Sequence, residues 1–146
     1  MKINVCIPAY NNEKTILETL QSIKEQKFDD FSIPPDVEIA ILDDVSTDNT
    51  ISKIEEFLVN NKYPKTALYR GNKNEGLASS LNYLVSQCSE EDIIVFLAGD
   101  DYLLPDALDK IYLSFEKNSQ LGIIVRPYYW FKDDWRKPVR WTKTKN

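Results

Sequence analysis

Apolar residues along the chain recur at two different spacings. Every second residue is apolar in KINVCIP (2–8), which predicts a β-strand, whereas the spacing of three and four residues in 13–26 predicts a helix. The runs VEIAIL (37–42) and DIIVFL (92–97) are almost wholly apolar, as parallel strands covered on both faces are. We expect 92–97 to be the most buried strand.

The remaining elements continue an alternation of strand and helix. A third strand is expected at 66–71, and further helices at 51–61, at 76–88 and from Pro105 through Phe115. Four strand–helix units in succession predict an α/β fold with a mostly parallel sheet, helices on both faces and right-handed crossovers. The predicted fold is therefore Rossmann-like.

The last part of the chain has a different pattern. GIIVRPYYWF (122–131) is expected to be a strand interrupted at Pro127, residues 132–134 a turn, and VRWTK (139–143) an antiparallel return that forms an edge hairpin. We predict a core at 1–125 and a separate tail at 126–146.

Length and composition indicate an ordinary globular domain. The 146 residues are 42% hydrophobic and 28% charged, enough for one domain with a real core. No apolar run approaches the ~20 residues of a membrane helix, and MKINVCIP lacks the apolar core and cleavage site of a signal peptide. The expected compartment is the cytoplasm, with attachment to the inner face of a membrane left open.

Cysteine and histidine usage narrows the chemistry. Cys6 and Cys88 both lie in apolar patterns and are expected to be buried, reduced thiols. The absence of histidine excludes Cys/His zinc sites and the usual Ser-His-Asp triad. Any metal should therefore be a hard cation on oxygen ligands, Mn²⁺ or Mg²⁺.

The tail is basic and aromatic. Residues 126–146 hold seven Lys and Arg against two Asp and Glu, together with Trp130, Trp135, Trp141, Tyr128, Tyr129 and Phe131. Such a segment can contact nucleic acid or anionic lipid. We favour the alternative that the aromatics pack on a neighbouring domain, and expect no nucleic-acid partner.

Two acids directly follow the second predicted strand. Ligands of open α/β sheets bind beyond the carboxyl ends of the strands, where Asp43 and Asp44 are expected to lie. A carboxylate there can accept an N–H from a nucleobase, and Tyr10, after the first strand, can stack on the base. The alternative is that Ser46 or Asp48 caps the next helix and the two acids are solvated.

A second acidic pair follows the fourth strand in FLAGDDYLLPDAL (96–108). Adjacent like charges repel, so Asp100 and Asp101 are expected to have a cation or a network of hydrogen-bond donors as partner. One or two carboxylates suffice for Mg²⁺ or Mn²⁺ on a diphosphate, because phosphate oxygens and water complete the coordination. The alternative is helix capping, with Asp101 four residues before Pro105.

Four segments in order carry a family resemblance: IPAYNNEKTILETLQSI, ILDDVSTDNT, NKNEGLASSLN and FLAGDDYLLPDAL. In this order and spacing, over roughly residues 1–110, the chain resembles family 2 glycosyltransferases with the GT-A fold. The resemblance implies a nucleotide-diphosphate sugar donor, often UDP-linked. It also implies a divalent metal and an inverting transfer to a hydroxyl of a saccharide, lipid-linked or protein acceptor.

The resemblance also implies roles for particular residues. Tyr10 would lie against the base and Asp44 would bond its N–H edge, in a pocket shaped by Pro8, Ala9 and Glu13, with Asp43 and Ser46 in the same loop. Asn74 and Gly76 would line the diphosphate or ribose region. Asp101 would be the more direct metal ligand and Asp100 would lie nearer the ribose or sugar.

The chain departs from the family pattern in three ways. Ala98 replaces the first acid of the Asp-x-Asp motif, which lowers the expected metal affinity, and Val45 replaces a frequent glycine. The acceptor-binding half, which supplies the catalytic base, would lie beyond the chain end or in a second subunit. Asp133 and Asp134 are the only late acids and are expected to be a turn tip.

Two other functions remain open. A catalytically idle module that binds nucleotide sugars and positions a partner enzyme would share the donor site. A phospho-receiver domain would need an acceptor Asp after its third strand and a Lys after its fifth, where this chain has Gly71-Asn72 and Pro127.

Overall fold

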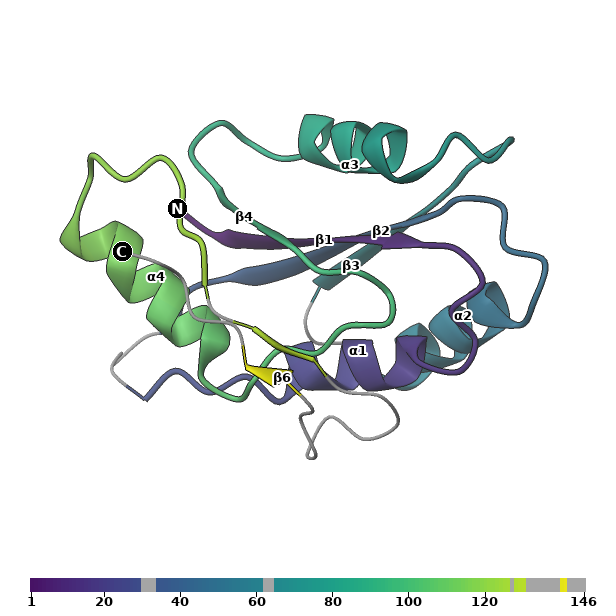
Figure 1. Ribbon diagram of the computed structural model, residues 1–146, viewed down its shortest axis with the longest axis horizontal. Helices are drawn as coiled ribbons and strands as arrows, with labels where there is room; N and C mark the ends of the chain where they lie inside the picture. Colours follow the sequence, from purple (N-terminus) through teal and green to yellow (C-terminus); the bar gives the residue numbers. More distant parts are fainter. Residues whose placement is uncertain (30–33, 62–64, 127, 131–139, 142–146) are drawn as a thin grey trace. The chain divides into compact units, whose positions relative to one another are not determined.

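A computed structural model describes residues 1–29, 34–61, 65–126, 128–130 and 140–141 (Figure 1). Their elements alternate as predicted, with ends that differ by a few residues. In chain order they are β1 (Ile3–Ala9), α1 (Ile16–Lys24), β2 (Val37–Asp43), α2 (Thr50–Asn60), β3 (Lys65–Arg70), α3 (Leu77–Ser86), β4 (Ile93–Phe96), α4 (Ala107–Lys117), β5 (Tyr129–Trp130) and β6 (Arg140–Trp141).

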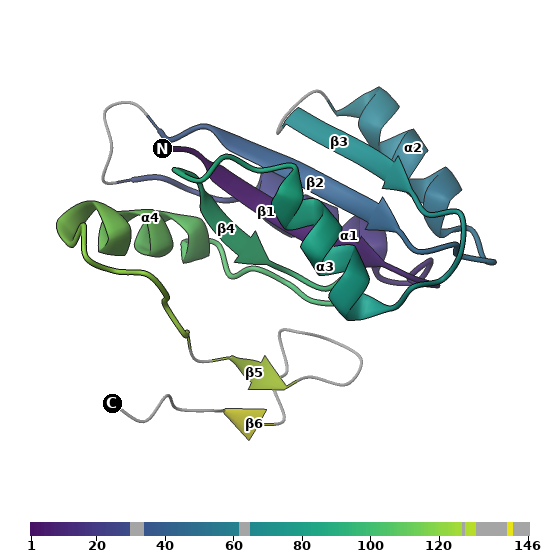
Figure 2. The same cartoon turned by 90° about the horizontal axis from the view of Figure 1, so that it is seen from above.

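The first four strands form one parallel sheet in the order β3-β2-β1-β4, seen side by side in Figure 2. In register, Ile3 of β1 lies opposite Val37 of β2 and Ile93 of β4. Helix α3 covers one face of the sheet, and α1 and α2 cover the other (Figure 1). This arrangement confirms the predicted α/β fold, and it brings the loops after β1, β2, β3 and β4 to one edge.

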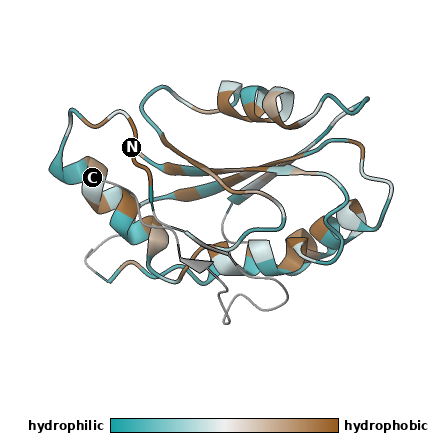
Figure 3. Ribbon diagram, in the orientation of Figure 1, coloured by the Kyte–Doolittle hydropathy of each residue, from teal (hydrophilic) through white to brown (hydrophobic). Residues whose placement is uncertain are grey.

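Both faces of the central strands are apolar because both are covered by helices. Figure 3 shows largely hydrophobic colouring along these strands. On the α3 face, Cys6, Ala40 and Leu42 pack with Leu84 of α3. On the strands the side chains alternate between faces, so Val5 and its neighbours of like parity face α1 and α2. Those helices contribute buried residues Ile16, Leu20, Ile23 and Ile54.

The prediction that the fourth strand is the most buried is wrong. β1 holds the central position, with Ile3, Val5 and Ile7 wholly buried, whereas Phe96 at the end of β4 is 57% exposed. Within the described residues β4 pairs with β1 alone, so it is an edge strand. An apolar run thus identified a strand but not its position in the sheet.

The two cysteines are free thiols, as predicted. Cys6 is buried, Cys88 is half-buried, and their Sγ atoms lie 3.9 Å apart. Burial is the main cause that raises the pKa of Cys6 to about 12, so its thiol stays protonated at neutral pH. In the described part of the chain no helix has the length and apolarity needed to cross a membrane.

The chain separates into two compact units, Met1–Tyr112 and Leu113–Asn146. In the second unit, residues 122–126 have no regular secondary structure, so the predicted strand over 122–131 is wrong there. Its remaining part is β5, which pairs antiparallel with β6 and confirms the predicted return. The predicted turn at 132–134, with Asp133 and Asp134, lies outside the described residues. The boundary between 125 and 126 stays a prediction.

Candidate functional site

A pocket of about 220 Å³ opens at the carboxyl ends of β1, β2 and β3. It combines the loop after β1, the end of β2 and the first turn of α3. Its lining residues are Pro8, Ala9, Tyr10, Asp44, Asn74, Gly76, Leu77 and Ser80. Six of these eight are site residues predicted from the sequence, and they come from three separate segments of the chain.

The two pocket residues that sequence reasoning missed are Leu77 and Ser80. Leu77 is 63% exposed at the start of α3, and Ser80 is 2% exposed with its hydroxyl donating to the Gly76 carbonyl at 3.1 Å. Ser80 follows Gly76 by four residues, one helical turn, so it lies on the same face as the pocket. The spacing of four residues from Gly76 could therefore have identified Ser80 as a pocket residue from the sequence.

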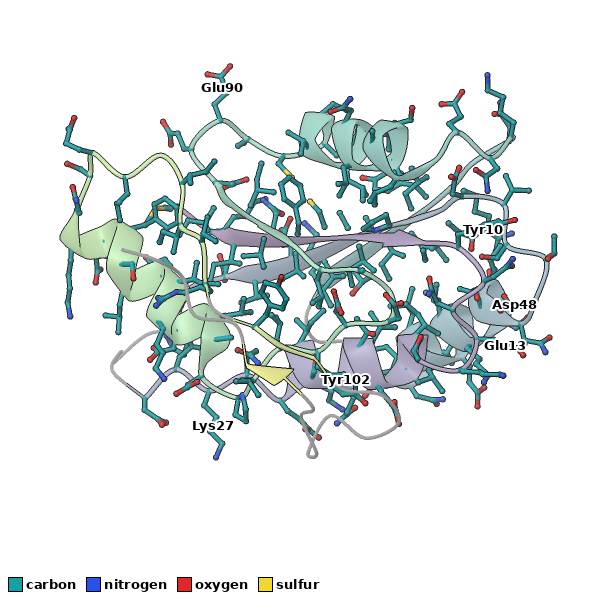
Figure 4. The ribbon with its side chains drawn as sticks, viewed as in Figure 1. Tyr10, Glu13, Lys27, Asp48, Glu90 and Tyr102 are labelled. Atoms are coloured by element: carbon teal, nitrogen blue, oxygen red, sulfur yellow. The ribbon has the colours of Figure 1, made fainter. Side chains whose placement is uncertain are left out.

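Tyr10 presents an aromatic ring at the pocket mouth. The residue is 49% exposed, and its backbone N–H donates to Oδ1 of Asn12 at 2.9 Å. Figure 4 shows Tyr10 at the same end of the sheet as Glu13 and Asp48. A half-exposed ring on a fixed backbone can stack on a planar ligand.

Side chains join the loop after β1 to the loop after β2. The Asn11 N–H donates to Oγ of Ser46 at 2.9 Å, and Thr47 N–H donates to Oδ1 of Asn11 at 2.8 Å. The Asn49 N–H donates to Oε2 of Glu13 at 3.1 Å. Glu13 and Ser46 therefore hold the two loops together and do not line the pocket.

Asp43 and Asp44 are buried, 1% and 5% exposed. Oδ2 of Asp43 accepts the Ser46 N–H at 3.0 Å, while its Oδ1 is buried with no hydrogen-bond partner among the described residues. The two oxygens of Asp44 accept the N–H groups of Glu75 and Gly76 at 2.9 and 2.8 Å. The alternative in which this pair is solvated is therefore wrong.

The backbone conformation at position 76 requires a glycine. Its φ is +82°, a region that residues with a side chain rarely adopt, and it directly precedes α3. This conformation directs its N–H toward Asp44, where a charged acceptor strengthens the bond. Asp44 thereby holds the pocket wall formed by Asn74 and Gly76.

Asp100 and Asp101 lie in a turn after β4. The Asp101 N–H donates to the Ala98 carbonyl at 3.0 Å, and both acidic residues are exposed. α4 begins at Ala107, directly after Asp106, so Asp101 does not cap it and that alternative is wrong. Desolvation, and after it the charge of Asp100, raises the pKa of Asp101 above its usual range.

The acidic turn suits a hard divalent cation. Two adjacent carboxylates offer oxygen ligands, and their mutual repulsion favours a bound positive charge. No cluster of three or more Cys, Asp or Glu with metal-binding geometry occurs among the described residues. The turn therefore fits a cation that takes its other ligands from a diphosphate and water, and not a site enclosed by protein.

Val45 has an unusual backbone conformation beside the pocket. Its φ is +66°, where a β-branched side chain crowds the backbone at a cost of about 1–2 kcal/mol. Val45→Gly relieves this strain, but glycine also makes the unfolded chain more flexible, which offsets about 0.5–1 kcal/mol of the relief. We therefore expect Val45→Gly to raise the free energy of unfolding by about 0.5–1 kcal/mol. Urea denaturation measures this change.

A matched control for Val45→Gly is Val59→Gly. Val59 is 81% exposed and lies in α2, where the backbone is helical and valine is not strained. Here glycine should lower the free energy of unfolding by a few tenths of a kcal/mol. Opposite signs at the two positions are expected, and destabilisation at both would contradict the strain at Val45.

Comparisons with known proteins agree with this geometry. The model of "Glycosyl transferase family 2" matches residues 4–146. Chondroitin synthase of Escherichia coli is 32% identical over 122 residues, 84% of this chain and 16% of that protein. Poly(ribitol-phosphate) beta-N-acetylglucosaminyltransferase TarS of Staphylococcus aureus is 31% identical over 108 residues, 74% of this chain and 18% of that protein.

Solved structures give the same result. S. aureus TarS 1–349 in complex with UDP-GlcNAc superposes with a TM-score of 0.68 at 28% identity, over 80% of this chain and 32% of that one. The mannosyltransferase PcManGT of Pyrobaculum calidifontis, in complex with GDP-Man and Mn²⁺, gives 0.61 at 27% identity, over 69% and 28%.

The chain spans between 16% and 41% of the length of the first curated relatives. The family match nevertheless covers nearly the whole chain, and the parallel sheet of this chain superposes on the structural neighbours described above. The four sequence segments, the sheet and the pocket are thus consistent with one ancestry, and the chain belongs to glycosyl transferase family 2.

Proposed function

We propose that this chain is the donor-binding part of a glycosyltransferase, which binds a nucleotide-diphosphate sugar together with Mn²⁺ or Mg²⁺. The observation that carries the proposal is the pocket in which Tyr10, Asp44 and Gly76 meet; Asp100 and Asp101 do not line it and follow β4 at the same edge of the sheet. The pocket volume of about 220 Å³ is below the ~300 Å³ at which pockets hold a drug-sized ligand, so it suits the base rather than the whole donor.

UDP is the proposed nucleotide. The relative with the higher TM-score of the two described above was solved with UDP-GlcNAc, and a further structure of that protein holds UDP. In the proposed complex the Tyr10 ring stacks on the base. Asp44 still has lone pairs beside its two backbone bonds, and these accept the N–H edge of the base. Asn74 and Gly76 line the ribose or diphosphate.

Asp100 and Asp101 of the acidic turn would hold the proposed metal. Asp101 is the proposed ligand, with Asp100 nearer the ribose or sugar. When bound, a divalent cation stabilises the charge that develops on the departing diphosphate. The two carboxylates of this chain would bind the cation. Inverting transfer to an acceptor hydroxyl also requires a base, which would come from outside the donor site.

A panel of nucleotides tests the proposal by thermal unfolding. UDP with Mn²⁺ at a hundred times its Kd should stabilise the protein by about 2.7 kcal/mol, which raises Tm by several degrees. UMP with Mn²⁺, which keeps the base and ribose but lacks the diphosphate, is the matched control and should give a much smaller rise. If neither UDP nor GDP, with or without Mn²⁺, changes Tm, the donor site is wrong.

A second candidate, a module that binds the donor without transferring it, is favoured by Ala98, which stands where the family resemblance implies the first acid of the Asp-x-Asp motif. The two functions share the binding result. They differ in the full-length protein, where only the enzyme transfers the sugar or slowly hydrolyses the donor.

A further inference from the structure

The side chain of Asn12 lies between the loop that carries Tyr10 and the turn that carries Asp100 and Asp101. Its Oδ1 accepts the Tyr10 N–H at 2.9 Å. On its other side is Gly99: a Cβ placed on this glycine would lie 2.6 Å from Oδ1 and 2.9 Å from Cγ of Asn12. One carboxamide therefore contacts both ends of the candidate site.

Two hydroxyls at the start of α1 also bind the backbone of the acidic turn. The hydroxyls of Thr15 and Thr19 donate to the Gly99 carbonyl at 2.9 and 3.1 Å. Thr19 is wholly buried and Gly99 is buried, so these bonds are shielded from water. The turn is therefore held at Gly99 by these two bonds and packs there against the Asn12 carboxamide.

The contact explains why a glycine stands at position 99. The φ of Gly99 is not in the left-handed region, so its conformation does not exclude a side chain. Its packing does: a methyl group here would overlap the Asn12 carboxamide, which the Tyr10 N–H holds in place. An alanine at 99 should therefore displace Asn12 and break its bond to Tyr10.

We infer that Asn12 is a positioning residue that fixes the Tyr10 backbone relative to the Asp100–Asp101 turn, and so sets the spacing between the base end and the metal end of the donor site. The inference rests on the proposed function, because it concerns how a nucleotide diphosphate spans the two ends. Such a ligand has a fixed length, and a site preorganised to that length binds it more tightly.

A purely structural role in starting α1 does not account for this side chain. The bonds that begin the helix use the backbone of Asn12, whose carbonyl accepts the N–H groups of Thr15 and Ile16 at 3.0 and 2.9 Å. The Asn12 N–H donates to Oγ1 of Thr50 at 2.8 Å. All three bonds survive in Asn12→Ala, which removes only the contacts to Tyr10 and Gly99.

A double-mutant cycle tests the inference with Asn12→Ala, Gly99→Ala and the two together. The first readout is the Kd of UDP with Mn²⁺, measured by calorimetry. Each single variant should weaken binding about tenfold, the loss expected for one hydrogen bond of this kind, and the double variant should be no weaker than Asn12→Ala. The second readout is the NMR chemical shift of the Tyr10 amide. Gly99→Ala should move it in the wild-type background and leave it unmoved in Asn12→Ala.

Asn12→Asp supplies the conservative rescue, since it retains an oxygen that accepts the Tyr10 N–H. The Tyr10 amide should therefore stay hydrogen-bonded, without the upfield shift expected in Asn12→Ala. Additive losses in the double variant, or a Tyr10 amide that Asn12→Ala leaves unmoved, would overturn the inference. Should Gly99→Ala fail to fold, the pair Asn12→Ala and Asn12→Asp decides it. If the wild-type chain binds neither UDP nor GDP, the proposed function is wrong. The Tyr10 amide shifts test only whether Asn12 connects Tyr10 to Gly99.

Discussion

Asp101→Ala is expected to abolish the Mn²⁺-dependent part of the rise in Tm that UDP produces. Desolvation and the charge of Asp100 raise the pKa of Asp101, so its carboxylate is destabilised until a cation binds. Without it, Asp100 remains the only carboxylate of the turn. The variant should lose only the metal-dependent part of the stabilisation of about 2.7 kcal/mol that UDP with Mn²⁺ gives at a hundred times its Kd, so its Tm rises less, while the rise given by UDP alone persists.

The matched control is Asp29→Ala, which removes an exposed carboxylate outside the candidate site and should leave the metal-dependent rise intact. An unchanged rise in Asp101→Ala would remove this residue from the metal role. Lowering the pH provides a second check. Because protons compete with the cation at Asp101, the metal-dependent rise should diminish at a higher pH than the ordinary aspartate value of 3.8 predicts.

The raised pKa also has a defined sign for the metal-free protein. At pH values between the ordinary pKa of 3.8 and the raised pKa of Asp101, this carboxyl is protonated more often in the folded state than in the unfolded state. Its contribution to the free energy of unfolding therefore decreases as pH rises through that interval. Asp101→Asn removes this dependence, and in the absence of metal it should be more stable than the wild type at neutral pH.

Local pattern predicted which elements form but not how deeply each is buried. The apolar runs at β2 and β4 are nearly equivalent in sequence, yet β2 lies inside the sheet and β4 at its edge in the described residues. Strand order depends on the crossovers, which periodicity does not record. Residues 122–126 are apolar in the same way and have no regular structure, because a strand also requires a partner strand.

The sequence did predict that the loops after the four parallel strands lie at one edge of the sheet. Polar residues at the end of a buried strand marked where these loops begin. Which of them line the pocket was not predictable. Glu13 and Ser46 belong to the same motifs as Tyr10 and Asp44, but they bond to the facing loop. Contacts between segments more than thirty residues apart decide this division, and a single sequence does not show them.

The largest expected loss of stability is for Asp44→Ala. Asp44 is 5% exposed, and its carboxylate accepts two backbone N–H groups that join β2 to the start of α3. Hydrogen bonds to charged groups contribute about 1.5–3 kcal/mol each, and Asp44→Ala removes both of them. We expect the free energy of unfolding to fall by about 3–4 kcal/mol, measured by urea denaturation at constant m-value.

Asp43 supplies the comparison that separates a general effect of a buried acid from this particular link. It is 1% exposed, but one of its oxygens accepts a single N–H and the other has no hydrogen-bond partner. Asp43→Asn should therefore cost less than Asp44→Asn, in which an amide group must face one of the two N–H donors. Equal losses would contradict the link. Because Gly76 and Asn74 form the pocket wall that Asp44 holds, UDP should no longer raise Tm in Asp44→Ala, even at temperatures where this variant remains folded.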